Sequence, residues 1–107
     1  MKRGDLVTVA LKGEYGKPRP ALVVQSDLFD AHPSVTIMPV TSDLRDMPLF
    51  RVDVEPTDQN GLRKASQVMI DKIHTVSRER CGSSFGRLEE DRMVVVNRLM
   101  VLFLGMG

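Results

Sequence analysis

The chain of 107 residues contains no tryptophan and a single cysteine, and aromatic residues make up only 5% of it. Cys81 cannot form a disulfide within the chain, and residues 1–5 lack the apolar core of a secretory signal peptide. Neither sign of charge is in clear excess, because the formal net charge is +1. We therefore expect a cytoplasmic protein without an extended basic arm, which must meet any polyanion through a local cluster of charges.

Long apolar runs and the common metal or phosphate motifs are also missing. The longest apolar run, residues 93–104, is interrupted by two polar residues and is too short to span a bilayer. His32, His74 and Cys81 are scattered without the spacing of a zinc site, and no glycine-rich phosphate loop is present. The sequence therefore predicts no membrane span, no bound metal and no cofactor.

The first two-thirds of the chain have the pattern of β-structure, and the end has that of a helix. Strands are predicted at residues 6–11, 20–25, 35–40, 50–55, 66–70 and 73–76. The last two are predicted either as separate strands or as one strand that is broken near Asp71 and Lys72. A helix is predicted to follow the acidic residues 89–91, which complement the positive end of its dipole, and to end at Gly105.

The predicted helix is apolar over most of its circumference. Met93, Val96, Met100 and Leu104 recur at helical spacing, and further apolar residues fill the remaining sides. This pattern indicates burial on more than one side, and a domain of this size has little core to offer. We therefore interpret the stripe as core or dimer packing, and expect a homodimer.

Arg19 stands between two prolines at the start of a predicted strand. Pro18 and Pro20 fix their own φ and push their neighbours toward extended backbone, so Arg19 is held out of any helix. Its planar guanidinium can donate two parallel hydrogen bonds to a phosphate. The alternative is an arginine that only keeps a strand edge soluble.

Five blocks of the sequence, in their order and spacing, resemble the MazF/PemK (Kid) family of bacterial endoribonuclease toxins. The blocks are residues 2–6, 19–24, 39–42, 71–76 and 86–88. The resemblance covers the whole chain and implies one toxin domain, residues 1–107, that is mainly β with a C-terminal helix, built as a small SH3-like β-barrel. It also implies a homodimer that cleaves single-stranded RNA (mRNA) selectively and without a metal, leaving a 2′,3′-cyclic phosphate and a 5′-hydroxyl.

The resemblance further implies a cognate antitoxin with an acidic, disordered tail. Such a tail would fold across the RNA groove and place its carboxylates against Arg19 and nearby basic residues. Operator DNA would be bound only through that antitoxin.

Arg19, Thr41 and Asp71 match the catalytic positions of the family. Cleavage by the 2′-hydroxyl of the RNA needs a base, an acid and donors that stabilise a more negative phosphorane. A guanidinium hardly ever deprotonates, so Arg19 suits a clamp on the non-bridging oxygens. The Thr41 hydroxyl can donate to a phosphate oxygen, although Thr41 to Asp43 can also be a simple turn. Asp71 matches a proton-transfer position, and the alternatives are a turn aspartate or an ion-pair partner of neighbouring Lys72.

A second set of residues is predicted to contact RNA. It consists of Glu14, Tyr15, Lys17, Ser42, Lys72 and His74. Tyr15 is the only aromatic residue in a loop that we expect to be exposed, so base recognition is expected to rest on hydrogen bonds. The chain departs from the family pattern at Lys72, where glutamine is usual, and in a shorter loop at residues 12–17. Both departures leave the base preference open.

Two functions of other classes remain as alternatives. A CcdB-like topoisomerase poison shares the barrel, but the sequence ends Gly105-Met106-Gly107 without the aromatic C-terminal tail on which that mode relies. A catalytically silent barrel could serve as a binding or autoregulatory module. The pairing of Arg19 with Thr41 favours the endoribonuclease.

Overall fold

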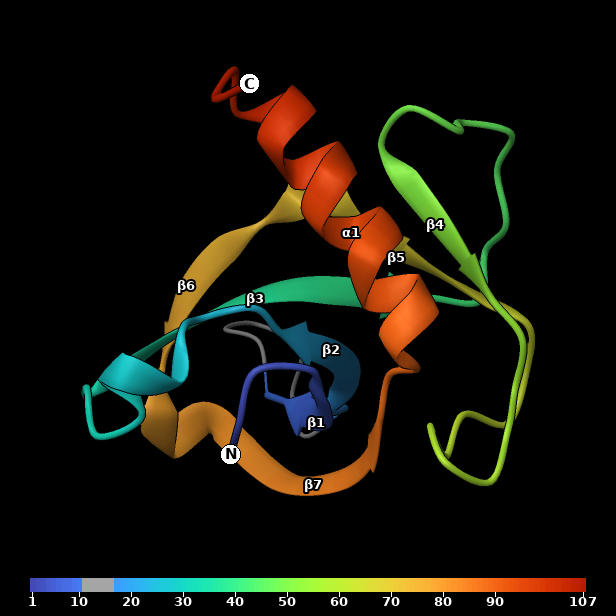
Figure 1. The fold of residues 1–107 in the computed structure, drawn as a ribbon. Coiled ribbons are helices and arrows are strands. Elements are labelled where there is room, and N and C mark those ends of the chain that lie inside the picture. The colour runs from blue at the N-terminus through green and yellow to red at the C-terminus, as the bar shows by residue number, and fades with distance from the viewer. Residues whose placement is uncertain (11–16) are drawn as a thin grey trace.

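The computed structural model describes residues 1–10 and 17–107, and in that part of the chain strands precede one C-terminal α-helix (Figure 1). The strands are β1 (Asp5–Val9), β2 (Arg19–Val23), β3 (Ser34–Thr41), β4 (Arg51–Val54), β5 (Ser66–Met69), β6 (His74–Ser77) and β7 (Cys81–Arg87). Helix α1 spans Glu90–Phe103, and short 3₁₀ turns form η1 (Asp27–Phe29), η2 (Ile70–Lys72) and η3 (Arg78–Arg80). The predicted class, mainly β with a C-terminal helix, is confirmed.

The described strands form one curled antiparallel sheet of small-barrel form. Its order is β4-β5-β3-β2-β1-β7, and β6 also pairs with β3. Strand β3 is central, because it pairs along both edges. Its residue Ile37, for example, lies opposite Val23 of β2 on one edge and opposite His74 of β6 on the other. The end of β3 continues the pairing with β5, where Thr41 lies opposite Gln67.

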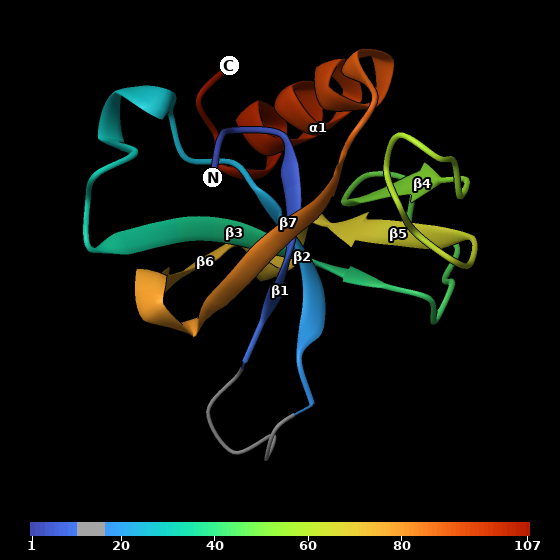
Figure 2. The same ribbon diagram turned by 90° about the horizontal axis from the view of Figure 1, so that it is seen from below.

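Successive side chains along the central strands point to opposite faces of the sheet and so belong to two separate clusters. Leu6, Leu22 and Met38 belong to the cluster that packs against α1, which lies along one side of the sheet (Figure 2). Val7 and Ala21, their sequence neighbours, belong to the second cluster on the opposite face. The sheet is therefore buried on both faces near its centre, which fixes the register of β1, β2 and β3.

Most predicted elements are confirmed, and one strand was missed. The break between β5 and β6 falls at η2, which contains Asp71, as expected. No strand was predicted for residues 81–87, because glycine and serine weaken the β pattern there and no alternation is visible. Pairing with β1 forms β7 nevertheless. Helix α1 starts one residue later than the acidic run, with Glu89 as its N-cap, and Gly105 follows its end at φ +71°.

Helix α1 packs one face against the core of the described chain. Val96 is fully buried, and Met93, Val95, Leu99 and Met100 pack partly against the core. Large apolar side chains near the C-terminus stay exposed, namely Val94, Val101, Leu102, Phe103, Leu104 and Met106. The predicted burial on a second side is thus absent within the chain. No helix in the described ranges is long and apolar enough to cross a membrane.

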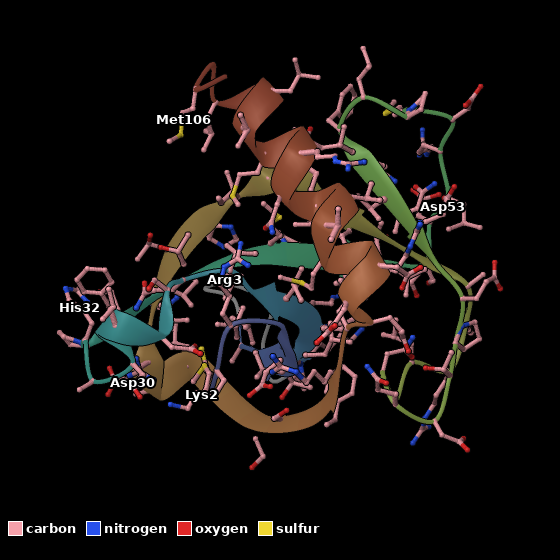
Figure 3. The ribbon with its side chains drawn as sticks, viewed as in Figure 1. Lys2, Arg3, Asp30, His32, Asp53 and Met106 are labelled. Atoms are coloured by element: carbon pink, nitrogen blue, oxygen red, sulfur yellow. The ribbon has the colours of Figure 1, made fainter. Side chains whose placement is uncertain are left out.

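Arg3 anchors the middle of α1 to the sheet. Its Nη2 donates to Asn97 Oδ1 at 2.6 Å, and its Nε donates to the carbonyl oxygen of Val24 at 2.9 Å. Figure 3 shows Arg3 below the helix, whereas Lys2 and Asp30 lie together near η1. Asn97, one of the two polar residues that interrupt the apolar run, therefore attaches the helix to the sheet.

Asn60 organises the connection between β4 and β5. It is fully buried, and its Oδ1 accepts hydrogen bonds at 3.0 Å from two backbone amides of the connection itself. Its Nδ2 donates to the carbonyl oxygen of Glu55 at 2.9 Å and to Glu89 Oε1 at 3.0 Å. Burial raises the pKa of Glu89, but hydrogen bonds from Thr57 and Asn60 outweigh it and hold that pKa below its usual value. The connection is therefore tied to the start of α1.

Candidate functional site

A groove of about 870 Å³ runs between the ends of β2 and β3, the β4–β5 connection and β7. Five of the predicted site residues line it, namely Arg19, Thr41, Ser42, Lys72 and His74. These residues come from β2, β3, the turn after β3, η2 and β6, which are dispersed over more than fifty positions of sequence. The antiparallel pairing around β3 brings them to one surface.

Arg19 and Thr41 lie on neighbouring strands. In the pairing of β2 with β3, Leu22 is opposite Met38 and Ala21 is opposite Pro39. Continued for two more residues, the same register sets Arg19 opposite Thr41. Arg19 is exposed at the start of β2 and Thr41 is half-buried at the end of β3. A guanidinium and a hydroxyl are thereby presented from adjacent positions to the same groove.

The hydroxyl oxygen of Thr41 accepts a hydrogen bond within a turn, and the hydroxyl proton remains available for donation. Its Oγ1 accepts a hydrogen bond from the backbone N–H of Asp43 at 3.0 Å. The turn interpretation from the sequence is therefore correct, and it fixes the oxygen without using the hydroxyl proton. Asp43 itself is engaged by Arg45, whose hydrogen bond and charge lower the pKa of the Asp43 carboxyl.

His74 lines the groove with an exposed side chain and a defined ring tautomer. Its Nδ1 lies 2.8 Å from the carbonyl oxygen of Lys72. A carbonyl oxygen only accepts, so Nδ1 carries the proton of this hydrogen bond. In the neutral ring, Nε2 is therefore the acceptor.

The other predicted residues stand apart from the groove. Asp71 lies in η2 but does not line it, and Asp71 Oδ1 is buried without a hydrogen-bond partner in the described ranges. Lys17 is exposed and precedes Arg19 by two residues, also outside the lining. Glu14 and Tyr15 lie outside the described residues. The proposed roles of these four side chains stay predictions.

The sequence interpretation missed one wall of the groove. This wall is formed by Thr8, Leu62, Arg63, Lys64 and Phe85. Four of them come from the β4–β5 connection and from β7, the strand that was not predicted, so no local pattern marked them. Only the dipeptide Asn60-Gly61, which is typical of a turn, marks this region in the sequence.

The groove is cationic although the chain is nearly neutral. Its described lining contains four permanently charged cations, Arg19, Arg63, Lys64 and Lys72, and no carboxylate. In residues 1–10 and 17–107, the last three side chains make no hydrogen bond or ion pair with the protein. Cations that lack protein partners favour an anionic ligand. The local cluster that a polyanion would require is present.

The remaining candidate groups for metal or thiol chemistry are not assembled. No three His, Cys, Asp or Glu side chains of the described chain gather as metal ligands. His32 lies near η1 (Figure 3), where its Nδ1 accepts from the backbone N–H of Ser34 at 3.0 Å. Burial raises the pKa of the Cys81 thiol, which therefore stays protonated at neutral pH.

The curled sheet, its C-terminal helix and its cationic groove define a small β-barrel protein with a basic surface between its strand ends. The chain belongs to the family of PemK-like, MazF-like toxins of type II toxin-antitoxin systems, whose model matches residues 2–104. It is 48% identical over 108 residues to a probable endoribonuclease MazF from Mycolicibacterium smegmatis (strain ATCC 700084 / mc(2)155), covering 100% of this chain and 99% of the relative.

Solved structures share the fold over nearly the whole chain. An endoribonuclease in complex with its cognate antitoxin, from a mycobacterial species, has a TM-score of 0.83 at 24% identity and covers 100% of this chain and 97% of its own. The Mycobacterium tuberculosis toxin MazF-mt6 has a TM-score of 0.82 at 22% identity, with coverages of 96% and 98%. A MazE-MazF structure from Deinococcus radiodurans also has a TM-score of 0.82, at 24% identity, with coverages of 100% and 98%.

Proposed function

We propose that the protein is a sequence-selective endoribonuclease toxin that cleaves single-stranded mRNA without a metal ion. The observation that carries this proposal is that Arg19 and Thr41 line one groove whose described lining has four cations and no carboxylate. An RNA backbone gains favourable contacts along the whole groove, and one phosphate reaches both side chains. Since mRNA is cytoplasmic, we expect the toxin to act there.

The proposed reaction is an internal transesterification. The 2′-oxygen of a ribose attacks the adjacent phosphorus, so the O2′–P bond forms and the P–O5′ bond breaks. The products are a 2′,3′-cyclic phosphate and a 5′-hydroxyl. Arg19 donates to the non-bridging oxygens as their negative charge grows, and Thr41 adds a neutral donor. Asp71 matches the proton-transfer position of the family and is the candidate for one of the two proton transfers at O2′ and O5′, with solvent serving the other. His74 is expected to contact the RNA.

Cleavage is expected to continue at an unchanged rate in excess EDTA. The developing charge is stabilised by side-chain donors that are held in place by the strands, so removal of divalent cations takes away no participant. The measurement is incubation of the purified protein with a long transcript of little structure, followed by sequencing of the ends. A 3′-hydroxyl product, or activity that returns only with added magnesium, would contradict the proposed chemistry.

We also expect a homodimer in solution. The exposed apolar side chains of α1 cluster at its C-terminal end, where Leu102 is 60% exposed and Phe103 is 48% exposed. A second subunit that covers them would bury on the order of 1,200 Å² or more in total. Light scattering at micromolar concentration is expected to give twice the mass of the chain. A monomeric mass would refute this assembly.

The cognate antitoxin is proposed to restrain the enzyme by occupying the groove. Structural relatives include toxins solved in complex with antitoxins. Carboxylates of an acidic, disordered tail would pair with the groove cations, and their binding would weaken as salt rises. RNA and antitoxin should then compete for the same surface. Operator DNA would be contacted through the antitoxin alone.

A further inference from the structure

Phe85 is turned toward the groove by an irregularity in the pairing of β7 with β1. Leu6 lies opposite Gly86, and the next residue, Val7, lies opposite Ser84. Phe85 is therefore the extra residue of a β-bulge, with no partner on β1. Bulges redirect side chains and are frequent beside active sites. The Phe85 ring is 38% exposed and lines the groove, although burial in the core would be favourable for it.

The β4–β5 connection holds this ring from behind. Gly61 has φ +69°, and a Cβ atom built on it would lie 2.5 Å from the carbonyl oxygen of Phe85 and 3.1 Å from its Cδ1. Only glycine permits so close an approach. The neighbouring Asn60 is locked by the buried hydrogen bonds described above. The ring is thus held against a rigid backbone, which reduces the entropy lost when a ligand packs on its open side.

The groove that Phe85 lines has both apolar and cationic side chains. Leu62 and Met69 are half-buried apolar lining residues, and Arg63 and Lys64 are exposed cations of the same lining. This combination suits a nucleotide, whose base is flat and apolar on its faces and whose phosphate is anionic. An acidic peptide would also pair with the cations, but its carboxylates would gain no favourable contact from a flat aromatic ring.

We propose that Phe85 is the stacking platform for one unpaired nucleobase of the bound RNA. This inference rests on the proposed endoribonuclease function and adds to it a base-binding subsite at Phe85 in the groove that Arg19 and Thr41 also line. The RNA strand runs from the scissile phosphate across the groove, its next phosphates near Arg63 and Lys64 and one base on the ring. The sequence alone suggested recognition through hydrogen bonds, and stacking now supplies part of the affinity.

The test measures binding separately from cleavage. The probe is a labelled RNA that contains the sequenced cleavage site, with a single 2′-deoxynucleotide 5′ to the scissile bond so that it cannot be cut. Fluorescence anisotropy at fixed salt is expected to show about tenfold weaker binding for Phe85→Leu. Phe85→Tyr, which keeps the ring, should bind within about twofold of the parent protein. Phe29→Leu is the matched control, because Phe29 is 55% exposed in η1 and does not line the groove.

Abasic substitutions then identify the base. One abasic position is expected to weaken binding of the parent protein as much as Phe85→Leu does, and the variant should lose nothing further on that RNA. Two results would overturn the stacking platform. One is that the affinity losses from Phe85→Leu and from an abasic site are additive at every RNA position, and the other is that Phe85→Leu binds with unchanged affinity. A parent protein that binds this RNA but fails to cut its all-ribose form would refute the proposed function instead. Thermal unfolding of each variant verifies that the fold is intact.

Discussion

Arg19→Ala is expected to slow RNA cleavage about a hundredfold or more while leaving the fold and the dimer intact. The substitution removes a charge-assisted pair of donors that act on the phosphate as its charge grows, which corresponds to roughly 3 kcal/mol or more of transition-state stabilisation. Arg19 is exposed, so no core packing is lost. The measurement is single-turnover cleavage of an oligonucleotide that carries one ribonucleotide at the target site.

Two further variants make this result specific. Arg19→Lys should recover little of the rate, because an ammonium group does not reproduce the bidentate geometry of the guanidinium. Arg80→Ala removes the same charge from an exposed position in η3 that does not line the groove, and it should cleave at nearly the parental rate. A fully active Arg19→Ala protein would show that the catalytic centre lies elsewhere.

Gly86→Ala is expected to lower the free energy of unfolding by roughly 3 kcal/mol. A Cβ at this position would lie 2.1 Å from the carbonyl oxygen of Asn60 and 2.4 Å from its carbonyl carbon. Both are backbone atoms of a connection fixed by buried hydrogen bonds, so they cannot move aside without breaking those bonds. Urea denaturation followed by circular dichroism measures the loss.

Gly82→Ala is the matched control in the same strand. Its Cβ would meet the Thr8 hydroxyl at 2.4 Å, but that group belongs to a side chain that can rotate away. We therefore expect a loss of about 1 kcal/mol or less. Equal losses for the two variants would mean that the β4–β5 connection is not held rigidly against β7.

The parts of the fold that could be predicted are those in which one local pattern dominates. The strict alternation of residues 50–55 gave β4, because one of its faces is buried and the other is wet. The acidic run gave the start of α1 to within one residue, and Gly105 gave its end to within two. Arg19 and Thr41 were identified because their strands carry the motifs of the family, and the pairing of β2 with β3 then brought them together.

The parts that could not be predicted depend on contacts between distant segments. Strand β7 contains little apolar sequence and exists because β1 pairs with it. The position of Phe85 follows from a bulge, and a bulge is a property of two strands together. In the sequence, Arg63 and Lys64 look like ordinary loop cations. In the structure they line the groove, on the connection that contains the buried Asn60. A single sequence contains no local signal for any of these.

The central place of β3 has a consequence for how the protein can be controlled. Because β3 is hydrogen-bonded on both edges, its amides should exchange with solvent only when the whole domain opens. On this expectation Thr41 keeps its place during any partial opening, including fraying of α1. Loosening the fold would then be a poor way to switch the site off. We therefore expect control by another molecule that covers the groove, whose departure would leave an enzyme that needs no folding step before it acts.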